Sequence, residues 1–480
     1  MTEASMNSRY VVANFVSAAI VIAVALFWAR NELDPSPYGY DEADYAFAAS
    51  RGFIDNWSDT PSISLLEFVR IGLTRGRDRS QRSDLSTTLR ESGDIHGYRH
   101  WHGPLYFYLL RLAQAGAHDE YGVRAICLFA TFAGVAVIYF GCWWLWPGVQ
   151  GSLSGFLGSL LFLWNSATVL TAELAPHLLF SVVTIASIFA AAKMMQNGRR
   201  AHWYVAVALA GLAFSTMELA FALVIALAIL GHLERARLHP DAGFIARSLA
   251  AFVAPIAVVW PAALYKLSFI KSYLVMGYLA VFRKGAWGDV TFAETWKNRL
   301  IAMPVEWVAL IFAIVIVILR KDLRGRRAIS AFLLYGLLMM TAILRVNAPG
   351  PRYVTPFYPP LAVFTGCAIA AVLIDLKPLV RFAVVALIAL AVFFETSLQV
   401  PRQPRQPNPP DVALLAHVRG EHWETRNLLV PQIDVPTLHY YFPGARLRGY
   451  LDPADIPALI TNDHFDGVIY PDGPVNAAPR

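Results

Sequence analysis

Residues 38–45 read Tyr-Gly-Tyr-Asp-Glu-Ala-Asp-Tyr, a short distance after the apolar run Val11–Trp28. Three carboxylates therefore stand within four residues, where a membrane span would release the chain into water. Residues Ala43–Asp55 have the spacing of an amphipathic helix, so the acids lie at or near a helix N-terminus, where the helix dipole stabilises negative charge. Two interpretations stay open: Asp41 or Asp44 only caps this helix, or one of the acids is a catalytic carboxylate held at the membrane face.

Outward from this stretch the chain is apolar. It has 480 residues, of which 56% are hydrophobic and 15% charged, and its mean hydropathy is +0.46. Soluble domains carry about 25% charged residues, and apolar runs of about 20 residues, the length that crosses a bilayer, recur here. The sequence therefore predicts an all-α polytopic membrane protein, with the lipid bilayer as a partner and no nucleic acid, since the net charge of +6 comes from arginines between spans.

The first span and the cysteines support this interpretation. We expect Val11–Trp28 to be an uncleaved span, because it is longer than a signal-peptide core and lacks a clear small-residue cleavage site. All three cysteines, Cys127, Cys142 and Cys367, fall inside apolar runs, so we expect no disulfide framework.

Basic connections predict the topology. Further spans are expected at Arg124–Trp144, Ser152–Leu170, His177–Met195, Ser248–Leu264, Val305–Leu319, Ile329–Leu344, Phe357–Leu376 and Val380–Phe394, with a long run at Trp203–Leu230. If Trp203–Leu230 were one helix, its two basic flanks would lie on opposite sides of the membrane. A break near Ser215–Glu218 returns every short basic connection to the cytoplasm, as the positive-inside rule requires. The prediction is about eleven spans, with the N-terminus cytoplasmic, a large first outer loop and an outer C-terminus.

Three parts follow from this pattern. Residues 1–400 form the transmembrane domain, whose outer loop 31–120 carries the acids; the proline-rich segment 401–410 is a stiff linker; residues 411–480 alternate helix and strand and predict a small periplasmic α/β domain. Within that domain we expect helices at Asp411–Arg419 and Pro453–Thr461, strands at Asn427–Val430 and Gly467–Tyr470, and a strand or helix edge at Thr437–Tyr441.

The predicted outer face collects ionisable and aromatic residues. Candidates for substrate contacts are Tyr45, His102, Glu173 with His177 one helical turn later, Glu218, Lys266, Lys271, Arg283, Lys284 and Arg345. Each candidate also has a purely structural explanation. An arginine at a span end can anchor the helix at the membrane interface. Glu173 and His177 can pair with each other, and His100 and His102 can form hydrogen bonds or stack. Two histidines are fewer than the three protein ligands that zinc usually needs, so we predict no cofactor and leave a divalent metal open. Acids, arginines and lysines at an outer surface suit group transfer from a lipid-linked phosphate.

Several motifs together resemble the membrane glycosyltransferases of GT-C fold. Asp41-Glu42-Ala-Asp-Tyr45 looks like their Asp-Glu-x-x-Tyr motif, His102-Gly-Pro-Leu-Tyr106 like their His-Pro-Pro-Leu-Tyr segment, Glu120-Tyr-Gly-Val-Arg124 like their arginine at the second span, and Pro351-Arg352-Tyr353 with Pro356 like a late Arg-Tyr-x-x-Pro segment. The group includes protein O-mannosyltransferases and the aminoarabinose transferases of lipid A. Gly103 in place of a proline, and Glu173-Leu-Ala-Pro-His177 in place of an arginine and a tyrosine, depart from its pattern.

The resemblance implies an inverting hexosyl or pentosyl transfer from a polyprenyl-phosphate sugar to a lipid, glycan or protein acceptor, outside a bacterial inner membrane. It implies that Asp41 is the catalytic base, supported by Glu42 and Tyr45, and that Arg352 and Tyr353 lie near the donor phosphate. Two other classes remain as alternatives: a polytopic transporter or lipid flippase, which would place charges at mid-membrane and often show internal repeats, and a non-catalytic envelope scaffold.

Overall fold

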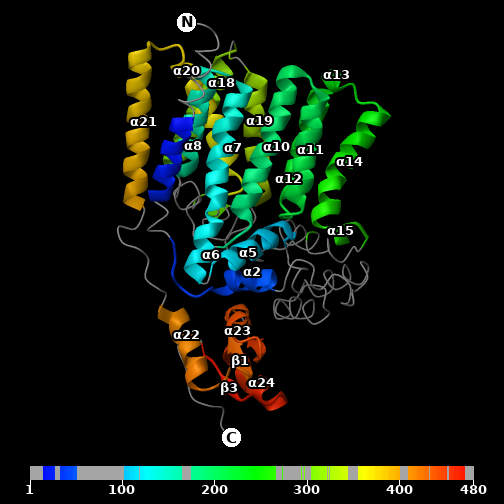
Figure 1. The fold of residues 1–480 in the computed structure, drawn as a ribbon, viewed down its shortest axis with the longest axis vertical. Helices are drawn as coiled ribbons and strands as arrows, with labels where there is room; N and C mark the ends of the chain where they lie inside the picture. The colour runs from blue at the N-terminus through cyan, green and yellow to red at the C-terminus, as the bar shows by residue number, and fades with distance from the viewer. Residues whose placement is uncertain are drawn as a thin grey trace.

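The computed structural model describes residues 15–27, 33–50, 102–117, 119–164, 174–265, 273, 293–294, 297, 304–321, 323, 325–343, 355–399, 409–431, 433–450 and 453–470. Figure 1 shows three layers along the long axis: a helix bundle, a pair of helices lying across one end of it, and a small unit with a β-sheet beyond them.

The bundle is built from the apolar runs. Among the described residues, five helices are long and apolar enough to cross a membrane: Glu120–Leu145, which comprises α6 (Glu120–Cys127) and α7 (Phe129–Leu145), then α10 (His177–Asn197), α14 (Ala242–Val259), α19 (Arg326–Ile343) and the part Pro378–Thr396 of α21 (Pro378–Gln399). Shorter apolar helices are Phe15–Phe27, α8 (Val149–Trp164), α12 (Ala220–Leu233), α18 (Pro304–Leu319) and α20 (Tyr358–Leu373). The total of eleven spans stays a prediction.

The predicted break in the run Trp203–Leu230 is confirmed. Helix α11 (Arg200–Phe214) ends and α12 begins on either side of a turn, and the hydroxyls of Ser215 and Thr216 donate back to the carbonyls of Gly211 and Leu212 at 3.2 and 3.0 Å. The Ser215 carbonyl also accepts from the Leu105 N–H at 3.1 Å. The turn is thereby attached to the helix layer at the end of the bundle.

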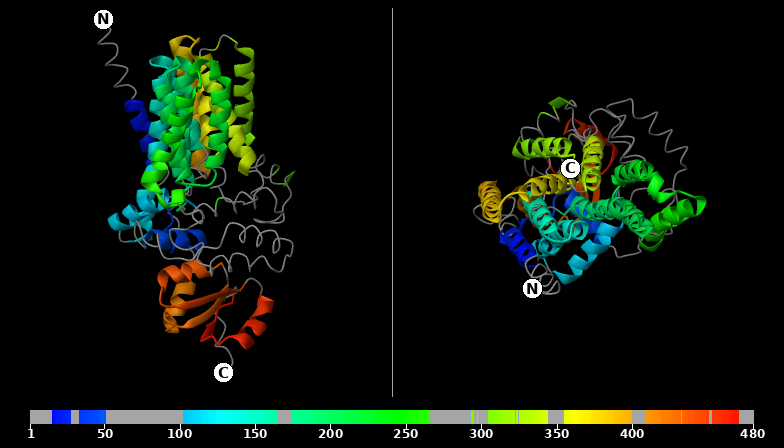
Figure 2. Two further views of the ribbon diagram at one scale, coloured as in Figure 1. Left: turned by 90° about the vertical axis from the view of Figure 1, so that its right-hand side faces the viewer. Right: turned by 90° about the horizontal axis from the view of Figure 1, so that it is seen from above.

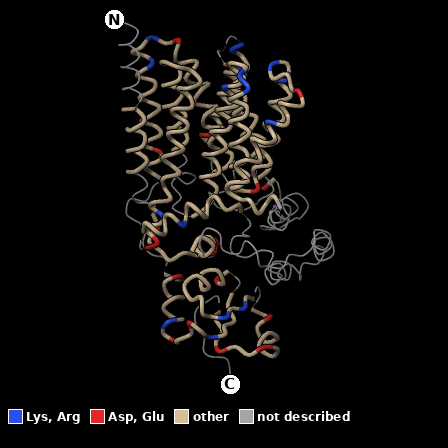
Figure 3. The backbone as a smooth tube through the Cα atoms, turned by 45° about the vertical axis from the view of Figure 1, so that its right-hand side comes forward, with Lys and Arg blue, Asp and Glu red and all other residues tan. Residues whose placement is uncertain are grey.

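The basic connections gather at the opposite end of the bundle from the two crossing helices, as Figure 3 shows. They are held locally: Arg320 pairs with Asp375 at 2.9 Å, and Arg200 donates to the carbonyls of Leu238 and His239. The basic connections and the helix that carries the acids therefore lie at opposite ends of the bundle, as the sequence predicts. The positive-inside rule assigns the basic end to the cytoplasm, and this orientation stays a prediction.

Close helix packing explains the glycine-rich stretch of α8. A Cβ on Gly366 of α20 would lie 2.5 Å from the Gly158 backbone nitrogen, a distance that real Cβ atoms do not reach. The two helices approach through these glycines, as small residues allow in membrane proteins. The stretch Leu153–Gly158 is therefore a packing surface.

Helices α2 (Tyr40–Ser50) and α5 (Leu105–Gly116) form the layer across the end of the bundle. Helix α5 is amphipathic and buries Tyr106, Phe107, Leu110 and Ala113 against the alanine-rich face of α2. We call α2, α5, α6 and the preceding residues 33–39 the acid platform. Figure 2 shows this platform between the bundle and the sheet-containing unit.

Beyond the platform, the chain forms a three-stranded parallel sheet in the order β2-β1-β3. Its strands are β1 (Asn427–Pro431), β2 (Arg446–Tyr450) and β3 (Gly467–Val468); its helices are α22 (Pro409–Gly420), α23 (Val435–Tyr441) and α24 (Ile456–Asn462), the last preceded by the turn Pro453–Asp455. Parallel strands need crossover connections, and α23 and α24 supply them. The segment Thr437–Tyr441 is helical, and β2 lies where no strand was predicted.

Candidate functional site

Helix α2 carries the three acids at its start. It begins at Tyr40, three residues before the predicted start, and the Ala43 N–H donates to the Gly39 carbonyl at 3.2 Å. Asp41 therefore lies in the first turn, not at the N-cap position, and its half-buried carboxylate lies where the helix dipole favours negative charge. Positions 51–55 of the predicted helix lie outside the described residues.

Glu42 forms a two-pronged ion pair with Arg124 of α6. Arg124 Nε lies 3.1 Å from Glu42 Oε1, and Nη2 lies 2.5 Å from Oε2. Glu42 Oε1 also accepts from the Leu174 N–H at 2.7 Å, just before α10. The carboxylate thus ties three separate elements of the chain together. Arg–carboxylate forks of this kind combine charge with fixed geometry.

The rest of the Arg124 side chain is also enclosed, with 2% of its surface exposed. Its Nη1 donates to the carbonyls of Asp34 and Ser36, each at 2.7 Å, and the guanidinium lies 5.0 Å from the centre of the Tyr38 ring. The segment 34–38 therefore wraps around Arg124. Because Asp41 follows this segment and precedes Glu42 in the helix, the same contacts fix the place of Asp41.

A second buried network joins α2 to the α11–α12 turn. Tyr45 Oη lies 3.3 Å from His102 Nε2, and His102 Nδ1 lies 2.8 Å from Glu218 Oε2. A carboxylate can only accept, so we assign the Nδ1 proton to the bond with Glu218 and the Nε2 lone pair to the Tyr45 hydroxyl. The His177 ring packs edge-on against His102, with centroids 6.1 Å apart.

Gly103, which stands where the motif that the chain resembles has a proline, has a steric reason to be glycine. A Cβ at this position would lie 2.3 Å from the Ser215 carbonyl oxygen and 2.8 Å from the Tyr273 hydroxyl. Only glycine allows this close approach of backbone to backbone. The departure from the motif therefore accompanies the packing of the α11–α12 turn against His102.

A cavity of about 680 Å³ lies beside the platform. Its polar lining includes Tyr106, Arg124 and His177, and the rest is largely apolar. Ile126 and Phe129 also line it and are 40% and 47% exposed on the outside of the protein. The cavity therefore has an exposed apolar rim, and its lining includes Arg124 and His177, which contact Glu42 and His102.

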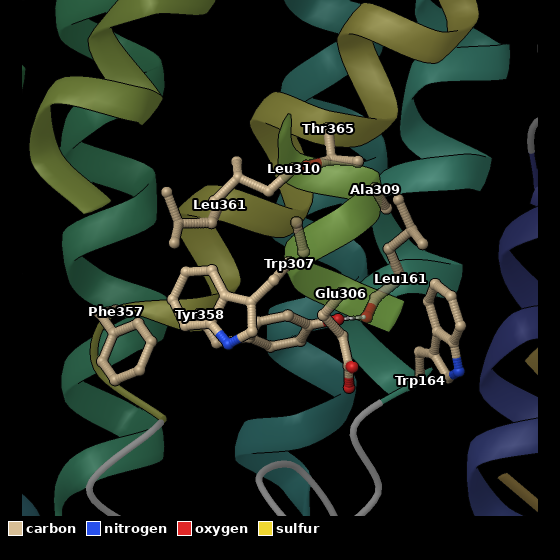
Figure 4. Close-up of a pocket in the computed structure, with 11 residues that line it drawn as sticks. Leu161, Trp164, Glu306, Trp307, Ala309, Leu310, Phe357, Tyr358, Leu361 and Thr365 are labelled. Atoms are coloured by element: carbon tan, nitrogen blue, oxygen red, sulfur yellow. Dashed lines mark hydrogen bonds between the residues drawn. The ribbon is translucent and has the colours of Figure 1, made fainter. Parts of the chain in front are cut away.

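A second cavity, of about 350 Å³, lies between α8, α18 and α20. In Figure 4, Trp164, Glu306, Trp307 and Tyr358 converge on it, and the Tyr358 hydroxyl donates to the Leu161 carbonyl at 2.7 Å. Its lining includes no residue of the acid platform. We therefore place the candidate site at the platform and the larger cavity.

The structure brings together part of the predicted set. Asp41, Glu42, Tyr45, His102 and His177 meet at the platform, and Glu218 joins them. Glu173, Lys266, Lys271, Arg283, Arg352 and Tyr353 lie outside the described residues, as do His100, Lys284 and Arg345, so their roles stay predictions. Among the described residues, no three His, Cys, Asp or Glu side chains converge as metal ligands do.

Two contacts at the acid platform were not predicted from the sequence. Arg124 was matched to a motif, but its pairing with Glu42 was not predicted; a charge near the start of an apolar run does signal that some buried partner exists. Tyr441, from the sheet-containing unit, also reaches the platform, and no motif marks it.

Comparisons with known proteins connect this geometry to a fold. No protein-family model and no curated protein sequence matches the chain. Among solved structures, it is similar to ArnT from Cupriavidus metallidurans bound to undecaprenyl phosphate, with a TM-score of 0.56, 14% identity, and coverage of 92% of this chain and 87% of ArnT. It is also similar to the archaeal oligosaccharyltransferase AglB from Archaeoglobus fulgidus, in complex with an inhibitory peptide and a dolichol-phosphate, with a TM-score of 0.56, 13% identity, and coverage of 91% of this chain and 64% of AglB.

Both structures have the GT-C fold, and this chain has it too. It spans less than two thirds of AglB but most of ArnT. Together with the apolar helices, the shared fold identifies the chain as a membrane protein.

Proposed function

We propose that the chain is a glycosyltransferase that moves a sugar from a polyprenyl-phosphate donor to an acceptor on the outer face of a bacterial inner membrane. The observation that carries the proposal is the acid platform at one end of a GT-C bundle, where the Arg124–Glu42 fork fixes the first turn of α2. The structures that share this fold hold undecaprenyl phosphate and dolichol-phosphate, which supports a lipid-phosphate carrier for this chain.

The proposed reaction assigns the proton to Asp41. Its carboxylate accepts the proton of an acceptor hydroxyl while the hydroxyl oxygen bonds to the anomeric carbon of the donor sugar. The bond from that carbon to the phosphate oxygen breaks on the opposite face, so polyprenyl phosphate leaves and the configuration inverts. General-base assistance of this kind contributes about a hundred- to ten-thousandfold to rate.

Glu42 takes a different role in this proposal. Its two oxygens already accept from Arg124 and from the Leu174 N–H, so we assign it to positioning Asp41, not to proton transfer. Tyr45, one helical turn after Asp41 on α2, contacts His102, and the His102 ring packs against His177, which lines the cavity. They suit contacts to the sugar or to the acceptor.

The apolar cavity suits the lipid part of a substrate, because its rim at Ile126 and Phe129 is apolar and exposed and its polar lining includes Arg124 and His177. The ionisable groups of the platform lie at the end of the bundle. A transporter would place its binding charges near the middle of its spans.

The test is direct. Purified protein is incubated with a panel of polyprenyl-phosphate sugars and membrane lipids, and the products are identified by mass spectrometry. Asp41→Asn keeps the size of the side chain and should lower turnover by at least about a hundredfold while donor binding persists. The matched control, Asp44→Asn, should lose much less. Near-normal transfer by a folded Asp41→Asn protein would show that Asp41 only supports the helix.

A further inference from the structure

Helix α23 of the sheet-containing unit docks on the acid platform through its last three residues. The Tyr441 hydroxyl accepts from the Tyr38 N–H at 2.8 Å and donates to Glu120 Oε1 at 2.7 Å. The Tyr440 ring packs edge-on against the Tyr38 ring, with centroids 5.3 Å apart. The centroids of the His439 ring and the Phe47 ring of α2 lie 4.3 Å apart. In Figure 1, α23 lies directly against α2.

These contacts lead to the residues that hold Asp41. Tyr38, whose backbone donates to Tyr441, presents its ring to the Arg124 guanidinium. Glu120, which accepts from Tyr441, lies one turn before Arg124 on α6, and Arg124 forks Glu42. The hydroxyl of Tyr441 thus bonds to both elements that enclose Arg124, the segment 34–38 and α6.

We propose that Tyr441 is a positioning residue for the transfer reaction, and that the C-terminal unit fastens the start of α2 in its working place through this hydroxyl. The inference rests on the proposed function for its catalytic consequence. The C-terminal unit thereby supplies a contact that joins Tyr38 to Glu120, and it comes from outside the acid platform.

The hydroxyl is suited to this task because it stays protonated. Burial, with the neighbouring Glu120 carboxylate, raises the pKa of Tyr441 far above its ordinary value. The group therefore donates to Glu120 at every pH at which the enzyme would work, and its oxygen remains available to the Tyr38 N–H. A hydrogen bond to a charged acceptor is stronger than one between neutral groups.

The test compares Tyr441→Phe with Tyr440→Phe in the full-length protein. Both variants keep the ring, but only the first removes a hydroxyl that bridges Tyr38 and Glu120. We expect Tyr441→Phe to lower kcat about tenfold, the effect of losing about 1.4 kcal/mol of hydrogen bonding, with little change in KM for the polyprenyl-phosphate donor. Amide hydrogen exchange in residues 33–50 should accelerate by a similar factor. Tyr440→Phe should leave both measurements near wild type.

A second pair of variants leaves the sequence of α23 untouched. Glu120→Gln retains an oxygen that accepts from Tyr441 but loses the charge, so it should fall between wild type and Tyr441→Phe, whereas Glu120→Leu should reproduce the Tyr441→Phe result. Equal kcat and equal exchange in all four variants would overturn the proposal. If the wild-type protein transfers no sugar, the proposed function fails, and the exchange data alone decide whether Tyr441 fastens α2: unchanged protection in Tyr441→Phe refutes it.

Discussion

Arg124→Lys is the perturbation that most directly tests how the acid platform is held. Arg124 donates four hydrogen bonds, two to Glu42 and one each to the carbonyls of Asp34 and Ser36. Lysine keeps the positive charge but presents a single nitrogen in place of the planar fork. It can retain the ion pair with Glu42 and one further acceptor, so about two hydrogen bonds are lost, one of them to a charged group.

The expected cost follows from those losses. Both lost bonds have the charged guanidinium as their donor, and a bond to a charged group contributes about 1.5–3 kcal/mol, so the low end of the range gives about 3 kcal/mol for the variant. Full removal of one partner of a buried pair costs about 3–5 kcal/mol, so the estimate stays below that limit. Because each 1.4 kcal/mol is a factor of ten, the opening equilibrium of residues 33–50 should shift by about a hundredfold.

Hydrogen exchange followed by mass spectrometry measures this opening in the purified protein, and sugar transfer measured on the same samples should fall with it. Arg111→Lys is the matched control: Arg111 also reaches α2, but through one hydrogen bond to the Ser50 carbonyl at 3.1 Å. Its loss should change exchange by about fivefold or less. If Arg124→Lys exchanges within about threefold of wild type, the fork is not what holds α2, and the assignment of Glu42 to positioning fails with it.

Two further predictions concern orientation and pH. In a background without natural cysteines, an impermeant thiol reagent should label Ala454→Cys and spare Ala242→Cys in intact cells; the reverse pattern would place the basic end of the bundle outside. Burial, with a smaller effect of Asp411, raises the pKa of Asp434, so the folded protein loses stability as pH rises from the unfolded pKa through the folded one. Asp434→Asn removes this loss and should raise the unfolding temperature at pH 7 but not at about pH 3, and equal effects at both values would contradict the assignment.

The sequence by itself determined the membrane-spanning class, the break between α11 and α12, and a helix at the acids. These features depend on hydropathy along the chain, on helical periodicity and on the placement of basic residues, all of which are local properties that a single sequence displays. The motif match indicated the GT-C fold for the same reason, because its pieces are short contiguous segments. The strand β2 was missed since its Arg-Leu-Arg-Gly-Tyr sequence lies at a sheet edge, where charged side chains are tolerated and the apolar pattern is weak.

Only the tertiary structure decided how the acids are held. Glu42 and Arg124 are 82 positions apart, His102 and Glu218 are 116 apart, and Tyr441 meets Glu120 across 321 positions. The sequence shows that a buried arginine needs an anion, since an unpaired charge in an apolar surround is too costly. Several acids could pair with Arg124, and the packing of α2, α5 and α6 together with the docking of α23 selects Glu42. Hydrogen bonds form only between groups that the whole fold brings within about 3 Å.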